Sequence, residues 1–185
     1  MALCDYLISA DITGYDCEHP AVKGAESVGL LINRSDIDQY TDSGFQRTIT
    51  LKCGSKQAWK ITQSGKTPFN GTQQEMVEGT YQNTITNTVQ FVVLKHNEDT
   101  AIDLFCLANG DFVAVIPNKD GTYQVYGSET GLRATGAVRE LYNDDTLAGW
   151  QITFTEEGAV KGNLFTTAAN FTALQSATAA CPQPH

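Results

Sequence analysis

One stretch decides the fold of this chain: Glu78-Gly-Thr-Tyr-Gln-Asn-Thr-Ile-Thr-Asn-Thr-Val-Gln-Phe-Val-Val-Leu-Lys95. Its threonines share one register and its apolar residues share the other, with Thr84, Thr86 and Thr88 opposed to Ile85, Val89 and Phe91. β-branched side chains at a period of two fit a half-buried pleated surface. The pattern predicts a long strand over residues 80–92.

A short helix is predicted directly after that strand. Polar side chains in Asn97-Glu-Asp-Thr100 can accept hydrogen bonds from the free amides of a helix start. Asn109-Gly110 tolerates the positive φ at which a helix stops. Between them, apolar residues recur at spacings of three and four, namely Ala101, Ile102, Leu104, Phe105 and Ala108. We expect a helix over residues 98–109 with Phe105 on its core-facing stripe.

The residues after the helix predict short strands separated by turns. Residues 112–116 and 122–126 are β-prone and flank the tight turn Pro117-Asn-Lys-Asp-Gly121. Residues 132–142 and 150–155 repeat this pattern around the loop 143–149. We therefore expect a meander of four strands.

The residues before the long stretch are more mixed. Residues 27–33 are typical of a strand, and residues 45–53 and 57–63 predict a hairpin across Gly54-Ser55. The intervening acidic residues, Asp36, Asp38 and Asp42, lack the glycine that a calcium-binding loop needs at its sixth position. We interpret this segment as a solvated loop.

Residues 64–79 predict a long loop between strands. Gly65-Lys66-Thr67 is similar to the end of a phosphate-binding loop, but Lys60 stands where the first glycine belongs and Pro68 interrupts the helix that should follow. Long loops without structure of their own are usually functional or disordered. We interpret this loop as a contact arm, with Thr67, Phe69 and Met76 as candidate interface residues.

Length and charge bound the possible functions. With 185 residues, of which 41% are hydrophobic, the chain can bury one full core without a metal or a disulfide. A net charge of -9 disfavours binding to phosphate backbones. The first residues lack a basic, apolar leader and no spanning segment is expected, so we expect synthesis in a cytoplasm.

Five cysteines, an odd number at wide spacing, predict reduced thiols rather than disulfides. Cys4, Cys17 and His19, with Cys53, form the alternative of a zinc site, although no C-x-x-C pair is present. Cys106 is interpreted as a core residue of the helix. No cofactor and no metal are therefore assigned.

The end of the chain differs in composition, because residues 162–181 carry no charged side chain. Such a segment is weakly solvated, so we expect either that it packs on an adjoining subunit or that it packs locally. The candidate interface residues here are Phe165, Phe171 and Leu174.

Together these patterns predict a mainly β fold, an antiparallel β-sandwich or partly open barrel with one flanking helix at 98–109. The core is expected over residues 44–157, with the long loop 64–79 inside it. Residues 1–43 should form an N-terminal arm with a first strand, and residues 158–185 an uncharged C-terminal arm.

Two segments carry a resemblance to a known family: Tyr126-Gly-Ser-Glu-Thr-Gly-Leu132 and Asp144-Asp-Thr-Leu-Ala-Gly-Trp-Gln-Ile-Thr-Phe-Thr-Glu-Glu157. With the predicted architecture, they resemble the tail-tube-fold structural proteins of bacteriophages, of the kind that infect Bacteroidetes-type bacteria. The resemblance implies a non-enzymatic virion subunit in the phage tail. It also implies self-assembly into rings, hexameric in tail tubes, that contact other tail proteins and let DNA pass through a channel.

The seam of such a ring can also be predicted from the residues. The stretch 80–94 is long and has no proline, and we interpret it as an exposed sheet edge. A neighbouring subunit would extend the sheet there, along Thr84, Thr86 and Thr88.

Two other classes of function remain open. A monomeric carbohydrate- or ligand-binding module would need an aromatic platform, for which the available residues are Trp59, Tyr123, Tyr126 and Trp150. An enzyme is disfavoured, because no spacing singles out an acid/base pair among three histidines and the carboxylates.

Overall fold

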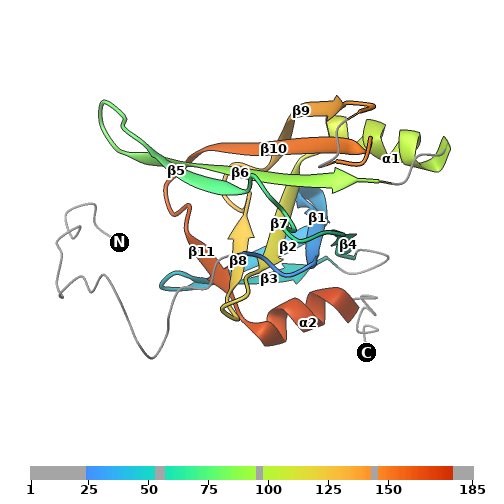
Figure 1. Cartoon of the computed structure of the whole chain (residues 1–185). Helices are drawn as coiled ribbons and strands as arrows, with labels where there is room; N and C mark the ends of the chain where they lie inside the picture. Colours follow the sequence, from blue (N-terminus) through green and yellow to red (C-terminus); the bar gives the residue numbers. More distant parts are fainter. Residues whose placement is uncertain (1–23, 53–56, 95–97, 143–145, 177–185) are drawn as a thin grey trace.

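The computed structural model describes residues 24–52, 57–94, 98–142 and 146–176, with backbone only for residues 98–102. Two antiparallel-rich sheets and two α-helices form the fold (Figure 1). The elements are β1 Val28–Asn33, the 3-10 helix η1 Arg34–Asp36, β2 Ile37–Ser43, β3 Gln46–Leu51, β4 Trp59–Thr62, β5 Gln73–Val77, β6 Thr84–Val93, α1 Glu98–Asn109, β7 Phe112–Pro117, β8 Tyr123–Tyr126, β9 Arg133–Arg139, β10 Trp150–Ala159, β11 Leu164–Thr166 and α2 Ala168–Ser176.

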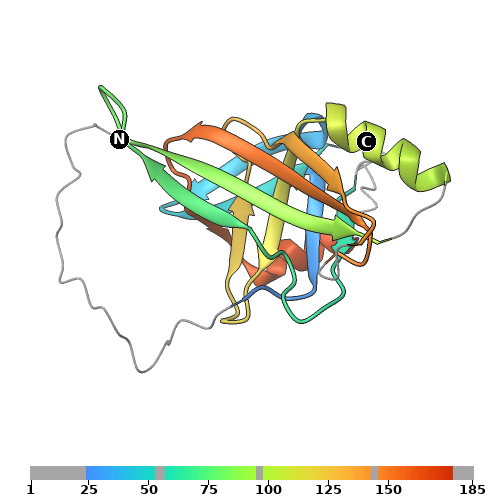
Figure 2. The same cartoon turned by 45° about the horizontal axis from the view of Figure 1, so that its top comes forward.

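The larger sheet has seven strands in the order β2-β3-β11-β8-β7-β1-β4, and the smaller has four in the order β5-β6-β10-β9. The smaller sheet lies over one face of the larger one, and α2 covers the opposite face (Figure 1). Helix α1 lies beside β9, at one end of the smaller sheet (Figure 2). The expected β-sandwich with a flanking helix is confirmed.

One core fills the space between the two sheets. Phe154, at the centre of β10, stacks on Phe91 with a centroid distance of 5.6 Å and contacts Phe112 edge-on at 5.5 Å. The buried residues around this aromatic group come from both sheets, namely Leu31, Val89, Ala114, Ile116, Leu132 and Ile152. Strand β7 has both faces buried, so it reads as a continuous apolar run rather than an alternation.

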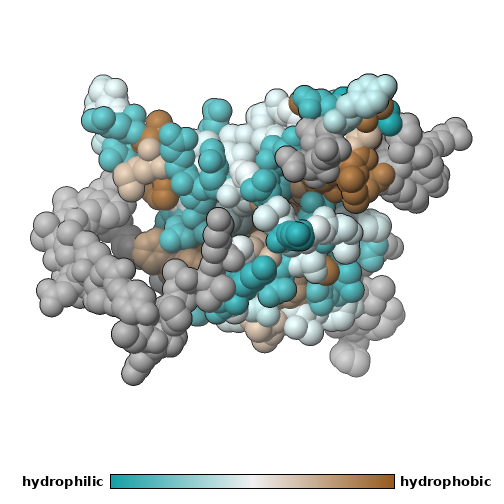
Figure 3. Space-filling view, in the orientation of Figure 1, coloured by the Kyte–Doolittle hydropathy of each residue, from teal (hydrophilic) through white to brown (hydrophobic). Residues whose placement is uncertain are grey.

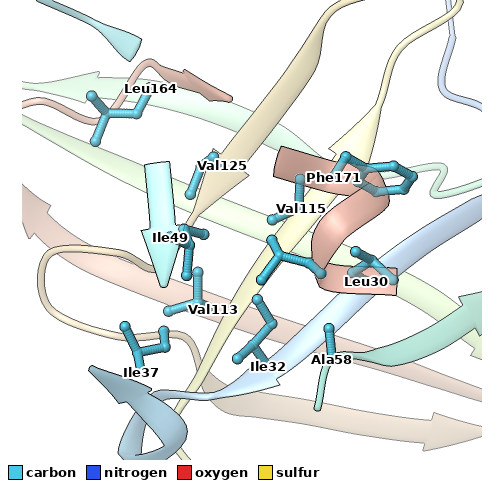
Figure 4. Close-up of a cluster of buried hydrophobic side chains, with 11 residues drawn as sticks. Leu30, Ile32, Ile37, Ile49, Ala58, Val113, Val115, Val125, Leu164 and Phe171 are labelled. Carbon is cyan, nitrogen blue, oxygen red and sulfur yellow. The ribbon is translucent and has the colours of Figure 1, made fainter. Parts of the chain in front are cut away.

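A second core lies between the larger sheet and α2 (Figure 4). Phe171 and Leu174 of α2 pack against Leu30, Val115 and other residues of the sheet. The helix is also hydrogen bonded to the sheet. Asn170 accepts a bond from the Ile49 amide at 3.1 Å and donates one to the Ile49 carbonyl at 3.0 Å, as a neighbouring strand would.

This second core corrects the prediction for the end of the chain. Phe171 and Leu174 are buried inside the subunit, and β11 is inserted between β3 and β8. Residues 164–176 are thus part of the larger sheet and its cover, which is the local-packing alternative. An uncharged segment folds back readily because its burial requires no charge to be desolvated.

The helix prediction is confirmed in its bounds and wrong in its facing. Leu104 and Leu107 pack against the core between the sheets. Phe105 is 73% exposed, and Cys106 is exposed as well. Helix α1 has apolar residues on more than one face, and the sheet covers only the face with Leu104 and Leu107. Periodicity alone could not show which face that would be, so the prediction for Phe105 was wrong.

The predicted long loop 64–79 and the predicted free edge 80–94 are both wrong in part. Residues Gln73–Val77 form β5, which pairs with β6 from Gln73 opposite Thr88 to Val77 opposite Thr84. Strand β6 therefore lies inside its sheet, between β5 and β10. Strand β5 was not predicted because its side chains are mostly exposed, and its sequence is therefore as polar as that of a loop.

Pairing in the first part of the chain also differs from expectation. Strand β3 pairs with β2, and β4 pairs with β1, so the predicted hairpin across Gly54-Ser55 does not form. The segment with the acidic residues is the turn η1 and β2 rather than a solvated loop. Likewise, the four predicted meander strands divide between the sheets, with β7 and β8 in one and β9 and β10 in the other.

Candidate assembly surface

The smaller sheet ends in two strands, β5 and β9, that pair with a described strand on one side only. An unpaired strand edge offers a row of backbone donors and acceptors to another chain. Monomeric proteins usually protect such an edge with lysine, proline or a covering element. Neither β5 nor β9 contains lysine or proline, and β2 at the edge of the larger sheet lacks them too. The edge at β9 is partly protected by an arginine at each end, an irregularity in its pairing with β10 and the neighbouring α1, whereas β5 carries only the charge of Glu75.

The edge at β5 belongs to a hairpin with β6 that projects beyond the larger sheet (Figure 1). The hairpin carries exposed apolar side chains: Met76 is 71% exposed, and Val77 and Tyr81 are exposed too. Met76 lies on the core-facing side of β5, since its neighbour Gln74 on that side bonds the buried Asn87 at 2.8 Å. Val77 lies on the other side.

The edge at β9 borders an apolar groove of about 530 Å³ beside α1. Its walls come from β9 and α1 and its floor from β10, with Leu104, Phe105, Ala108, Ala134, Ala137 and Ile152 among the lining residues. The small side chains of β9 leave the groove open. Figure 3 shows hydrophobic surface both on the hairpin and beside α1.

The outer face of the smaller sheet is rich in threonine and glutamine. In the row that crosses β9 and β10, Thr135 and Thr155 share a hydrogen bond of 2.9 Å between their hydroxyls. In the next row, Gln90 donates to Thr153 at 3.0 Å. Thr84, Thr86 and Thr88 lie on this face and are half-buried. Hydroxyls and amides thus cover the face in place of an apolar layer.

Beneath this sheet lies a buried carboxylate, Glu156, with 2% exposure. Its Oε2 accepts hydrogen bonds from Asn87 Nδ2 and the Gly127 amide, each at 2.7 Å. Its Oε1 accepts bonds from the amides of Glu129 at 3.0 Å and Thr130 at 2.9 Å. This one side chain therefore joins two segments, the loop 127–130 and β10. All four of these hydrogen bonds are internal, so Glu156 fixes the loop 127–130 against β10.

A second polar cluster supports the same loop from the larger sheet. Arg47 donates to both oxygens of Asp42, at 2.7 Å each, and to the Ser128 hydroxyl at 2.9 Å. The bonds from Arg47 hold the pKa of Asp42 below its ordinary value, and those bonds raise the pKa of Arg47 in return. Nearby, burial raises the pKa of Tyr40. The cluster fixes the loop that contacts Glu156.

A pocket of about 1190 Å³ opens between the sheets near α1. Trp59 lines it and is 55% exposed. The other candidate platform residues lie elsewhere: Tyr126 is buried and Trp150 partly buried in the core between the sheets, and Tyr123 packs on Phe171. The four aromatic residues form no common platform.

The predicted interface residues fall into three groups. Phe69 is buried at 4% exposure and packs over Gly29, so it joins Phe171 and Leu174 as a core residue of the subunit. Thr67 and Met76 are exposed, and Phe165 is half-buried on β11. The threonines of β6 share one face. Sequence analysis did not identify β9 as an edge strand, and nothing in Arg-Ala-Thr-Gly-Ala-Val-Arg distinguishes an edge strand from a central one.

No family model, curated protein or solved structure matches this chain. Within the described ranges, no group of three or more metal-ligating side chains lies together. The proposed zinc ligands Cys4, Cys17, His19 and Cys53 lie outside these ranges. No helix among the described residues has the length and apolar character needed to cross a membrane.

Proposed function

We propose that this chain is a bacteriophage virion structural subunit that assembles head to tail into a closed ring, forming part of a tail tube or a connector channel through which DNA passes. The observation that carries the proposal is the presence of two edge strands, β5 and β9, on one four-stranded antiparallel sheet. The sequence resemblance to tail-tube-fold proteins supplies the biological setting.

The number of strands is compatible with a ring. Adjacent strands alternate in direction from β5 to β9, so the two edge strands of an even-numbered sheet run in opposite directions. When copies are related by rotation about one axis, β9 of one subunit meets β5 of the next as an antiparallel pair. The alternation continues through every seam, and a closed ring leaves the smaller sheet without a free edge.

The stagger of the edge strands is also suited to a barrel. Glu75, in the middle of β5, lies opposite Thr86, whereas Gly136, in the middle of β9, aligns through Thr153 with Gln90. If β9 of one subunit pairs with β5 of the next so that Gly136 lies opposite Glu75, the strand register shifts by four residues across each four-stranded sheet. A shift of one residue per strand is that of eight-stranded barrels with shear of about 8, whose strands tilt by about 36°.

The face that such a ring would turn inward is suited to the passage of DNA. The larger sheet and α2 occupy one side of the four-stranded sheet, so the threonine- and glutamine-rich face is the one left for the channel. Among its residues, Glu75, Glu157 and Arg133 are charged, so the face carries one cationic side chain against two acidic ones. Firm binding to DNA needs several cationic side chains that displace counterions. A hydroxyl-lined wall can contact phosphates without holding them.

The test is to measure the mass of the purified chain by light scattering over a micromolar concentration series and to image it by electron microscopy. We expect rings with an axial opening. Val138→Lys on the exposed edge β9 should move assembly to higher concentration, since a lysine on an edge strand opposes pairing. Thr41→Lys on β2, the edge of the other sheet, is the matched control and should assemble normally. A chain that stays monomeric throughout the series contradicts the proposal.

A further inference from the structure

The apolar surface of the smaller sheet is divided between its two edges. Met76 stands exposed on β5, while the groove between β9 and α1 lies at the opposite edge. Because β6 and β10 separate β5 from β9, Met76 cannot reach the groove of its own subunit. Both features lie on the core-facing side of the sheet, since Ala134 pairs with the buried Phe154. Each could be covered by the other feature in a second copy.

We infer that Met76 of one subunit inserts into the groove between β9 and α1 of the next subunit and anchors the seam of the ring. This inference rests on the proposed head-to-tail assembly and names the side chain and the cavity that hold it together. The occupant of the groove is thus a second copy of this chain.

The register of the seam places the side chain at the groove. When the middle of β5 in one subunit pairs with the middle of β9 in the next, Glu75 lies opposite Gly136. The core-facing side of β5 then continues the core-facing side of β9. The irregularity in β9 between Ala134 and Gly136 then brings Met76 next to Ala134, on the side where the groove opens. A volume of about 530 Å³ accommodates the methionine and part of its strand. Methionine is flexible and fits irregular apolar cavities.

The charges beside the two edges are complementary. Glu75 is exposed on the outer side of β5, and the exposed Arg133 of β9 lies opposite the outer-face Thr155 and 3.9 Å from Asp111 of its own subunit. In the paired register these residues lie diagonally across the seam, a separation that long side chains span. Pairing of two β5 edges would instead bring Glu75 of both copies together, so charge favours the heterologous contact.

The contact is tested by five substitutions at four positions. Met76→Asp places a charge in the groove, and Ala108→Trp fills the groove from α1 without altering β9. Val77→Asp on the other side of β5, whose carboxylate would lie opposite Arg133 in the paired register, and Cys106→Trp elsewhere on α1 are the matched controls. All four positions are exposed, and circular dichroism checks that each variant is folded. Met76→Ala, which only shortens the side chain, should weaken assembly by roughly tenfold or more.

We expect rings from the wild type and both controls, and monomers from Met76→Asp and Ala108→Trp. Mixing these two monomeric variants leaves one intact seam, formed by Met76 of the Ala108→Trp chain and the groove of the Met76→Asp chain. The mixture should therefore form dimers containing one copy of each.

Rings that form equally well with Met76→Asp or Met76→Ala overturn the anchor but leave the ring proposal in place. Folded variants that give no dimer on mixing show that the two surfaces do not contact each other. A wild-type chain that never assembles contradicts both the anchor and the proposed function.

Discussion

Replacing Glu156 with alanine should strongly destabilise the subunit, whatever its state of assembly. The substitution leaves four donors without their acceptor: Asn87 Nδ2 and the amides of Gly127, Glu129 and Thr130. Each buried donor without a partner costs about 1–3 kcal/mol. Water can enter beside Glu129 and Thr130, whose bonds are only partly buried, which reduces the total below the sum.

We therefore expect the free energy of unfolding to fall by about 3–5 kcal/mol, the range for breaking a buried charged network. This loss is large, because the free energy of unfolding of a typical domain is only about 5–15 kcal/mol. Urea unfolding at one fixed protein concentration measures the change. Glu157→Ala, at the exposed neighbouring position, is the control and should change stability by less than about 0.5 kcal/mol. A loss under about 1 kcal/mol for Glu156→Ala would refute the view that this carboxylate holds the two segments together.

Two further predictions concern the facing of α1 and the ion pair between Asp42 and Arg47. Phe105→Ala should change the subunit's unfolding free energy by less than about 0.5 kcal/mol, because Phe105 is exposed. Phe154→Ala should instead cost about 3–5 kcal/mol through cavity formation in the core. If thermal unfolding shows similar losses for the two variants, Phe105 does not face solvent as described. Because the folded pKa of Asp42 is lowered from 3.8, its ion pair with Arg47 stabilises the fold above that pH and is lost as the pH falls through the folded pKa. Asp42→Asn should therefore be less stable than wild type near neutral pH and equally stable in acid, and a difference that persists in acid argues against a charge effect.

The sequence by itself determined the local elements of this protein. Alternation in residues 84–93 and the polar start and Asn-Gly end of helix 98–109 depend on neighbours within one or two turns, so strands and helix could be recognised there. The turn at Pro117-Asn-Lys-Asp-Gly121 is equally local. The class of the fold followed from these elements, because short strands with one amphipathic helix can bury their faces in few ways.

Only the tertiary structure decided which strands pair and which surfaces remain free. The partners of β3 are β2 and β11, and no pattern within Gln46–Leu51 specifies a strand that lies more than a hundred residues later in the chain. An uncharged strand without proline can be central or peripheral. Strand β6 is central because the polar strand β5 pairs with it and takes the edge position.

The candidate surface depends on the same long-range arrangement. Met76, Phe69 and Phe171 are all large and apolar, yet only Met76 is exposed. Met76 lies beyond the larger sheet, whereas Phe69 and Phe171 pack against that sheet. Similarly, Glu156 was one carboxylate among many in an acidic chain. Its role exists because folding brings the amides of Gly127 to Thr130 to it, and the physical reason is that a buried charge is stable only where distant parts of the chain supply its hydrogen bonds.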